Sequence, residues 1–172
     1  MKTTLILLSF LLFGTHTTDP FYTAVKSLEK INYFIKIDRY CKNADYTKKF
    51  CTEKPENNCF VQLAKEKEQA IDTSKIISIR RFFVKSTKDY GGKTFPRADI
   101  LEWQCTSVKD AEEIEQGLKK LSDKYSQYGE ICENKSYATS WRKNDKLYFI
   151  ITGGQYMSNE LPKLEKQLKS KL

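Results

Sequence analysis

The chain has 172 residues and a formal net charge of +8, from 30 Lys and Arg against 22 Asp and Glu. With 40% apolar and 13% aromatic residues but only 7 Gly and 4 Pro, its composition is that of a packed globular protein and excludes a disordered chain. A chain of this length is expected to fold as one ordinary domain.

Residues 1–18 have the pattern of a secretory signal peptide. Lys2 supplies the positive start, the apolar run 5–13 follows it, and the next residues are small or polar. The run is shorter than the roughly 20 apolar residues of a membrane-spanning helix, and no later segment approaches that length. We therefore expect a signal peptide and no membrane span.

The expected product is an exported, soluble single domain over 19–172, extracellular or periplasmic. Cleavage is expected between Gly14 and Asp19, where small residues are found. No cysteine precedes Cys41, so the signal lacks the cleavage-site cysteine of a bacterial lipoprotein. Loss of Lys2 leaves a basic domain with a net charge of +7.

The first part of the domain predicts two helices. Apolar residues recur every three or four positions over 19–39, and Asp19 before Pro20 suits a helix start. The polar segment 42–58 is expected to be a loop held by cysteines. A second, weaker amphipathic pattern predicts a helix over 59–71.

Strand patterns begin in the second half. Residues 76–85 are rich in β-branched and aromatic side chains and predict a strand. The irregular segment 86–98 contains two glycines and a proline. Strict alternation then predicts a strand over 100–105, with Leu101 and its odd-numbered neighbours facing the core and Glu102 facing away.

The remaining pattern repeats this order. A capping pattern at Ser107 and an apolar stripe predict a helix to Tyr125, alternation over 137–152 predicts a hairpin, and a last stripe predicts a helix over 157–168. We therefore expect an α+β two-layer sandwich in which an antiparallel sheet of about four strands, in ββαββα order, has helices on one face and follows two N-terminal helices.

Five cysteines in an exported chain favour disulfides. They are Cys41, Cys51, Cys59, Cys105 and Cys132. Sequence allows fifteen ways to form two bridges; proximity along the chain favours one bridge within the first three cysteines and one between Cys105 and Cys132. The fifth would be a buried thiol or would link two chains into a dimer.

Several kinds of catalytic chemistry lack their usual residues. The single histidine, His16, falls in or beside the signal, so histidine-dependent hydrolysis and histidine-bound zinc are not expected. The chain has no paired CxxC and no phosphate-binding glycine motif, and we expect no metal and no cofactor. A carboxylate pair could still support glycoside hydrolysis, but the nearest candidates, Asp99 and Glu102, should point to opposite faces of their strand.

The segment 86–98 is the best candidate binding loop, because long irregular loops in compact domains are usually functional or disordered. Basic and aromatic side chains alternate along it. They are Lys88, Tyr90, Lys93, Phe95 and Arg97. This combination suits an acidic protein or an anionic glycan, through charge attraction and buried ring area, while export makes nucleic acid a poor partner. An ordinary mobile connection would have the same composition.

The leading hypothesis is an exported binding protein without catalysis, such as an inhibitor, a neutraliser or a host-facing factor. The alternative is a small secreted hydrolase that uses two carboxylates. A scaffold joined through the odd cysteine is a third possibility. Asn134 begins an Asn-Lys-Ser acceptor for N-glycosylation in a eukaryotic source.

Overall fold

The computed structural model describes 19–37, 41, 43–66, 71–125, 138–152, 157 and 159–172, with the backbone alone for Leu63 and 121–125. Three sequence predictions lie outside the described residues: the signal peptide, Cys132 and the acceptor Asn134. No helix within the described ranges is long and apolar enough to cross a membrane.

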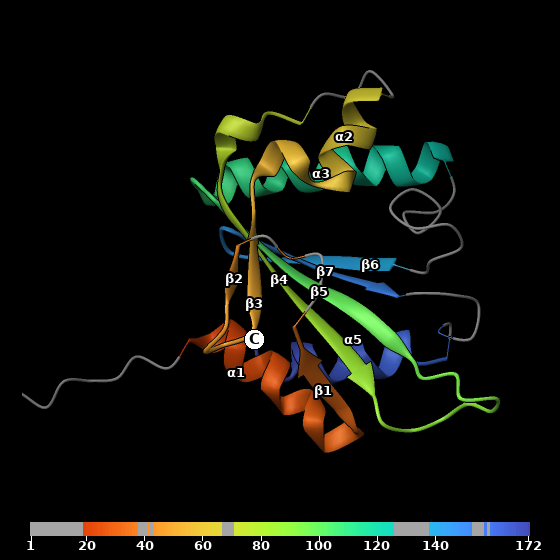
Figure 1. Ribbon diagram of the computed structural model, residues 1–172. Helices are drawn as coiled ribbons and strands as arrows, with labels where there is room; N and C mark the ends of the chain where they lie inside the picture. The colour runs from red at the N-terminus through yellow and green to blue at the C-terminus, as the bar shows by residue number, and fades with distance from the viewer. Residues whose placement is uncertain are drawn as a thin grey trace, which may run out of the picture.

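The described part of the chain is a mixed helix and sheet fold built on one antiparallel sheet of seven strands (Figure 1). The strands are β1 (Tyr33–Lys36), β2 (Ala44–Asp45), β3 (Phe50–Glu53), β4 (Ile76–Ser86), β5 (Arg97–Cys105), β6 (Ala138–Lys143) and β7 (Lys146–Thr152). Their order across the sheet is β2-β3-β4-β5-β7-β6, and β1 pairs with the end of β4 that β3 does not reach. The long hairpin of β4 and β5 is therefore the centre of the sheet.

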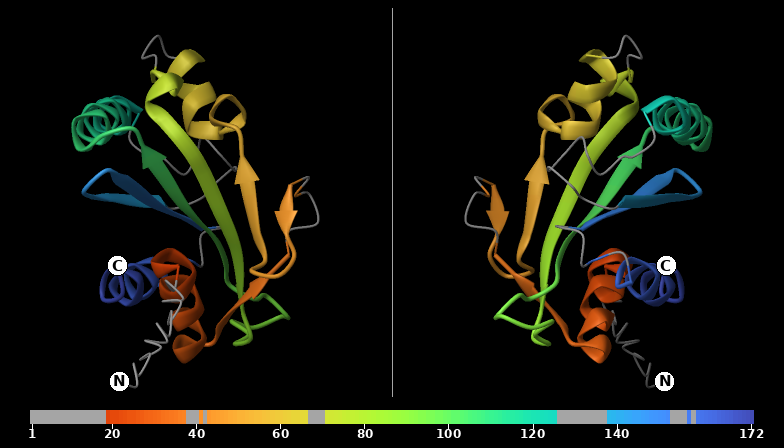
Figure 2. Two further views of the ribbon diagram at one scale, coloured as in Figure 1. Left: turned by 90° about the vertical axis from the view of Figure 1, so that its left-hand side faces the viewer. Right: turned by 90° about the vertical axis from the view of Figure 1, so that its right-hand side faces the viewer.

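Helices cover both faces of this sheet (Figures 1 and 2). Among the described residues, the α-helices are α1 (Pro20–Lys26), α2 (Cys59–Glu66), α3 (Val108–Tyr125) and α5 (Leu161–Lys169), and the 3₁₀-helices are η1 (Ser27–Ile31), η2 (Pro55–Asn57) and η3 (Thr73–Lys75). One face carries α2 and α3, and the other carries α1 and α5. The sheet lies between the two helical layers.

Each layer encloses its own apolar core. Phe21 and Leu28, from α1 and η1, pack with Leu164 of α5 against Phe82 and Ile100 of the sheet. On the other face, side chains of α2 and α3 pack against Trp103, Phe149 and their neighbours. Burial of apolar area on both faces stabilises the middle strands, at roughly 25 cal/mol per Å² removed from water.

The predicted four-stranded layout with helices on one face is wrong. From Ile76 onward the elements do follow the order strand, strand, helix, strand, strand, helix, but β1, β2 and β3 extend the same sheet. The helix predicted over 19–39 ends at Ile31, because Asn32 has a left-handed backbone (φ 68°) and reverses the chain into β1. The polar segment predicted as a loop forms the β2 and β3 hairpin, in which Asp45 accepts hydrogen bonds from two turn amides.

Glu102 also departs from the predicted exposure. The odd-numbered residues of β5 do face a core, as the alternation predicts: Trp103 and Cys105 are fully buried. Glu102, on the opposite face, is only 3% exposed, because α1 and α5 cover that face as well. Its carboxylate forms ion pairs with Arg80 and Lys146, so the charge of this buried acid is compensated within the apolar layer.

Candidate functional site

The candidate binding loop is shorter than its sequence pattern indicates. Strand β4 continues to Ser86 and β5 begins at Arg97, so the irregular segment is 87–96, called here loop 87–96. Its base is closed by two backbone contacts. The Ser86 amide donates to the Pro96 carbonyl at 2.7 Å, and the last strand pair joins Lys85 to Arg97.

Loop 87–96 has a defined internal structure. The Asp89 carboxylate accepts hydrogen bonds from the amides of Gly91 and Lys93, at 2.9 and 3.0 Å. Tyr90 donates its amide to the carbonyl of Thr94 at 2.9 Å. Gly91 and Lys93 both have positive φ, a backbone conformation that is sterically unfavourable for lysine. The hydrogen bonds to Asp89 stabilise this conformation at both residues. The loop therefore presents its side chains from a fixed backbone.

The five predicted residues do not gather in one place. Lys88, Tyr90, Lys93 and Arg97 are exposed, whereas Phe95 is half-buried under the Lys85 ammonium, 4.9 Å from the ring centroid. Arg97 belongs to β5. Lys88 and Tyr90 turn toward α5, where they line a groove.

This groove, called here the lysine groove, has a volume of about 490 Å³. Its walls come from the end of η1, the start of loop 87–96 and the first turn of α5. Each wall contributes one lysine: Lys30, Lys88 and Lys163. The carboxylates of Asp89 and Glu160 also line it, so the groove carries both signs of charge with an excess of positive.

Glu160 holds the two sides of the groove together. Its carboxylate accepts hydrogen bonds from the hydroxyls of Tyr33, at 2.9 Å, and Tyr90, and it pairs with Lys163 at 2.5 Å. Burial raises the pKa of this carboxyl, but the hydrogen bonds from Lys163, Tyr90 and Tyr33 together bring it below its usual value. Burial and the bond to Glu160 raise the pKa of Tyr33. Glu160 is therefore ionised and fully engaged at neutral pH.

Sequence reasoning missed Lys30, Glu160 and Lys163. Nothing in their local pattern marks them, since each is a polar residue at a helix end in a lysine-rich chain. They join the predicted Lys88 and Tyr90 only because η1, the loop and α5 meet at one end of the sheet.

The chain was compared with known proteins. No family model, no curated protein and no solved structure matches it.

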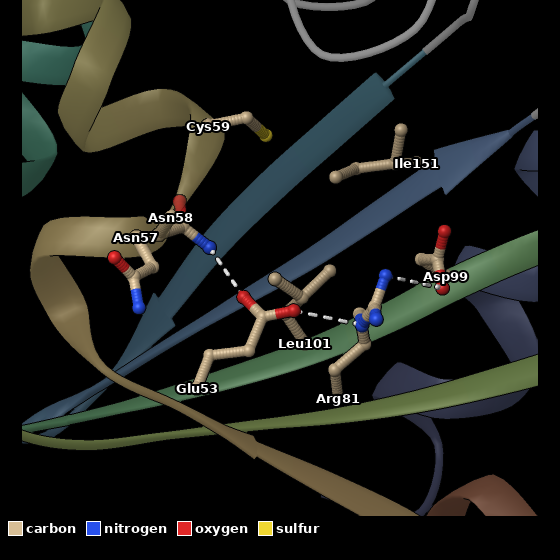
Figure 3. A pocket seen from close by; sticks show the side chains of 8 residues that line it. All are labelled: Glu53, Asn57, Asn58, Cys59, Arg81, Asp99, Leu101 and Ile151. Carbon is tan, nitrogen blue, oxygen red and sulfur yellow. Dashed lines mark hydrogen bonds and ion pairs between the residues drawn. The ribbon is translucent and has the colours of Figure 1, made fainter. Parts of the chain in front are cut away.

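A second hollow, of about 190 Å³, lies over the sheet beside α2 (Figure 3). Glu53, Arg81 and Asp99 come from the neighbouring strands β3, β4 and β5. Arg81 Nε lies 2.8 Å from Glu53, and its Nη1 lies 3.6 Å from Asp99. The buried amide of Asn58 donates to Glu53 at 3.1 Å. The guanidinium is thus engaged on both sides, and the arrangement neutralises charge across three strands.

The carboxylate pair considered from sequence is not brought together. Asp99 points into the hollow beside α2 and pairs with Arg81. Glu102 lies on the opposite face and pairs with Arg80. Two carboxylates on opposite faces of a sheet cannot flank one glycosidic bond, as general acid and nucleophile must. Within the described ranges, no group of three or more acids, histidines and cysteines could hold a metal ion.

The cysteines are partly as predicted. Cys41 and Cys51 form a disulfide, which confirms a bridge within the first cluster. Cys105 is a free and fully buried thiol, so the predicted bridge from Cys105 is wrong. Burial raises the pKa of this thiol to about 11. Cys59 is disulfide-bonded, and Cys132 lies outside the described residues.

Proposed function

We propose that the protein is an exported binding protein that holds an anionic partner, an acidic protein or an anionic glycan, on loop 87–96 and the adjoining end of the sheet. The observation that carries the proposal is the combination of a fixed backbone with exposed cations. Asp89 and the Tyr90 contacts order the loop, so Lys88, Lys93 and Arg97 are presented at little entropic cost on binding.

The local charge supports an anionic partner. Lys85, Lys88, Lys93 and Arg97 lie on or beside the loop, while the one acid of the loop, Asp89, is engaged by backbone amides. A cluster of one sign raises the association rate with an oppositely charged partner, and salt weakens the effect.

The test is capture of a stoichiometric partner from extracellular or periplasmic extract by the tagged protein. The variant K88E/K93E/R97E should lose the partner. The control K54E/K119E/K120E changes the net charge by the same amount. Its three exposed lysines lie away from the loop, Lys54 just before η2 and the other two on α3. It should retain the partner. Equal loss in both variants, or retention in the loop variant, would overturn the assignment to the loop.

A further inference from the structure

We infer that the lysine groove is the specificity site of this surface, and that it accepts an acidic side chain of a peptide segment, with Lys30 and Lys88 as its cation pair. The inference rests on the proposed function, since Lys88 belongs to both the groove and the loop. It adds a chemical class of partner, an acidic peptide, and a residue that the loop does not contain, Lys30.

Two of the three ammonium groups that line the groove have no carboxylate partner among the described residues. Lys163 is paired with Glu160. Neither Lys30 nor Lys88 has a carboxylate within ion-pair distance among the residues that the structure describes, although both line the same hollow. A carboxylate entering between them would gain charge-assisted hydrogen bonds.

The groove is already formed in the structure of the free protein. Tyr33 and Tyr90 hold Glu160 from two sides, and the Thr87 amide donates to the Asn32 carbonyl at 3.0 Å, which joins the loop to the end of η1. A volume of about 490 Å³ falls within the roughly 300–1,000 Å³ of typical ligand sites. A preformed site avoids much of the ordering cost of binding.

The charges that line the groove suit a peptide better than an anionic glycan. Asp89 and Glu160 line the groove beside the lysines. A sulfated chain, with charge on every few atoms, would bring sulfates against these carboxylates, and like charges in contact are unfavourable. A peptide can place one carboxylate between Lys30 and Lys88 and an apolar or aromatic side chain against Tyr90 and Ile31. The mixed charge of the groove therefore favours a peptide.

The experiment uses the full mature domain and two defined probes at physiological salt. The probes are a short peptide with two glutamates flanking a tyrosine and a sulfated glycosaminoglycan. We expect K30Q to weaken peptide binding about fivefold or more, the effect of losing about 1 kcal/mol of ion pairing, and to leave glycosaminoglycan binding within about twofold. The control K36Q, an exposed lysine on β1 outside the groove, should change neither.

The outcomes separate this inference from the proposed function. If K93E/R97E weakens binding of the peptide and K30Q does not, the loop binds anions and the groove assignment is overturned. If K30Q weakens glycosaminoglycan as much as peptide, the groove takes glycans and the peptide assignment is overturned. If the wild-type protein binds neither probe, and also captures no partner from extract, the proposed function fails. A peptide in which glutamine replaces both glutamates should bind at least about tenfold more weakly than the acidic one.

Discussion

Tyr33 of β1 donates a hydrogen bond to Glu160 at the start of α5, at 2.9 Å and across 127 positions of sequence. Tyr90 of loop 87–96 donates to the other oxygen of the same carboxylate. One buried acid thus joins a strand, a loop and a helix that the chain brings together only in the folded state. Removing its charge should loosen all three.

The variant E160Q should lower the free energy of unfolding by about 1–3 kcal/mol at pH 7, because the charge-assisted hydrogen bonds become neutral ones and one of the two tyrosine hydroxyls loses its acceptor oxygen. Denaturant titration measures the change. Glu56, an exposed acid of η2, provides the control, since E56Q should alter stability by less than about 0.5 kcal/mol.

The pH dependence of this effect has a definite sign. The pKa of Glu160 in the folded protein lies below its usual 4.5, so its stabilising contribution is complete above about pH 4.5 and disappears as pH falls through the lower folded value. The difference in stability between wild type and E160Q should therefore be constant near neutral pH and shrink in acid. A difference that grows in acid would contradict the assigned role.

Loop order should matter for binding more than for stability. In D89A the amides of Gly91 and Lys93 lose their acceptor, and Lys93 loses the contact that holds its positive φ. D89N removes the same charge but retains one acceptor oxygen, so it is the matched control for loop order. We expect D89A to bind an acidic peptide about threefold to tenfold more weakly than D89N, because the loop must then be ordered on binding. The free energy of unfolding should change by less than about 1 kcal/mol. Equal affinity in D89A and D89N would show that loop order is irrelevant.

Local sequence patterns correctly predicted the helices and strands that depend on the spacing of nearby residues. The β5 core face, the helix that begins after Ser107 and the β6 and β7 hairpin all follow from spacing, and the structure contains them. Strand β1 could not be predicted, because Ile31 and Ile35 continue the helical spacing of α1 and only the left-handed Asn32 breaks it. The sequence did not predict that α1 and α5 cover the second face of the sheet, because that face carries Glu102 and glutamate is normally exposed to solvent.

The site was predictable to the same extent. Lys88 and Tyr90 stand together in the sequence with other basic and aromatic residues, so composition found them. Lys30 and Lys163 are separated from the loop by about 60 and 70 positions and reach it only through packing of η1 and α5. No local spacing rule connects residues at such separations.

Cysteine chemistry offers an independent check of the fold. Cys41 is joined to Cys51, and Cys105 is a free, fully buried thiol. Peptide mapping without reduction should recover the link between Cys41 and Cys51. Because burial raises the pKa of Cys105 to about 11, its thiol should resist alkylation until the protein is unfolded and should react then.

The same burial bears on the dimer considered from sequence. A thiol that is fully buried cannot reach a second chain while the domain is folded. We therefore predict that Cys105 links no two folded chains, and that C105A leaves the band pattern on a non-reducing gel unchanged. A reducible dimer that disappears in C105A would contradict the buried position of this residue.

Arg80 pairs with two carboxylates beneath α1. Arg80 donates to Asp19, the N-cap of α1, at 2.5 Å and to Glu102 at 2.5 and 3.0 Å, with its guanidinium 5.1 Å from the Phe21 ring centroid. In R80M, Glu102 keeps Lys146 at 3.1 Å but stays buried with less compensation, so stability should fall by about 3 kcal/mol. In K146M, Glu102 keeps its two hydrogen bonds from Arg80, and the free energy of unfolding should fall by only about 1 kcal/mol.

The double variant R80M/E102M distinguishes the cost of an uncompensated charge from a need for the ion pair itself. Two apolar side chains on this face would extend the core around Phe21 and Tyr148, and replacing a buried ion pair with apolar residues is often neutral or stabilising. Denaturant titration of both single variants and the double should therefore give a double variant more stable than R80M. If the double variant is instead less stable than R80M, the network holds α1 on the sheet in a way that apolar packing cannot replace.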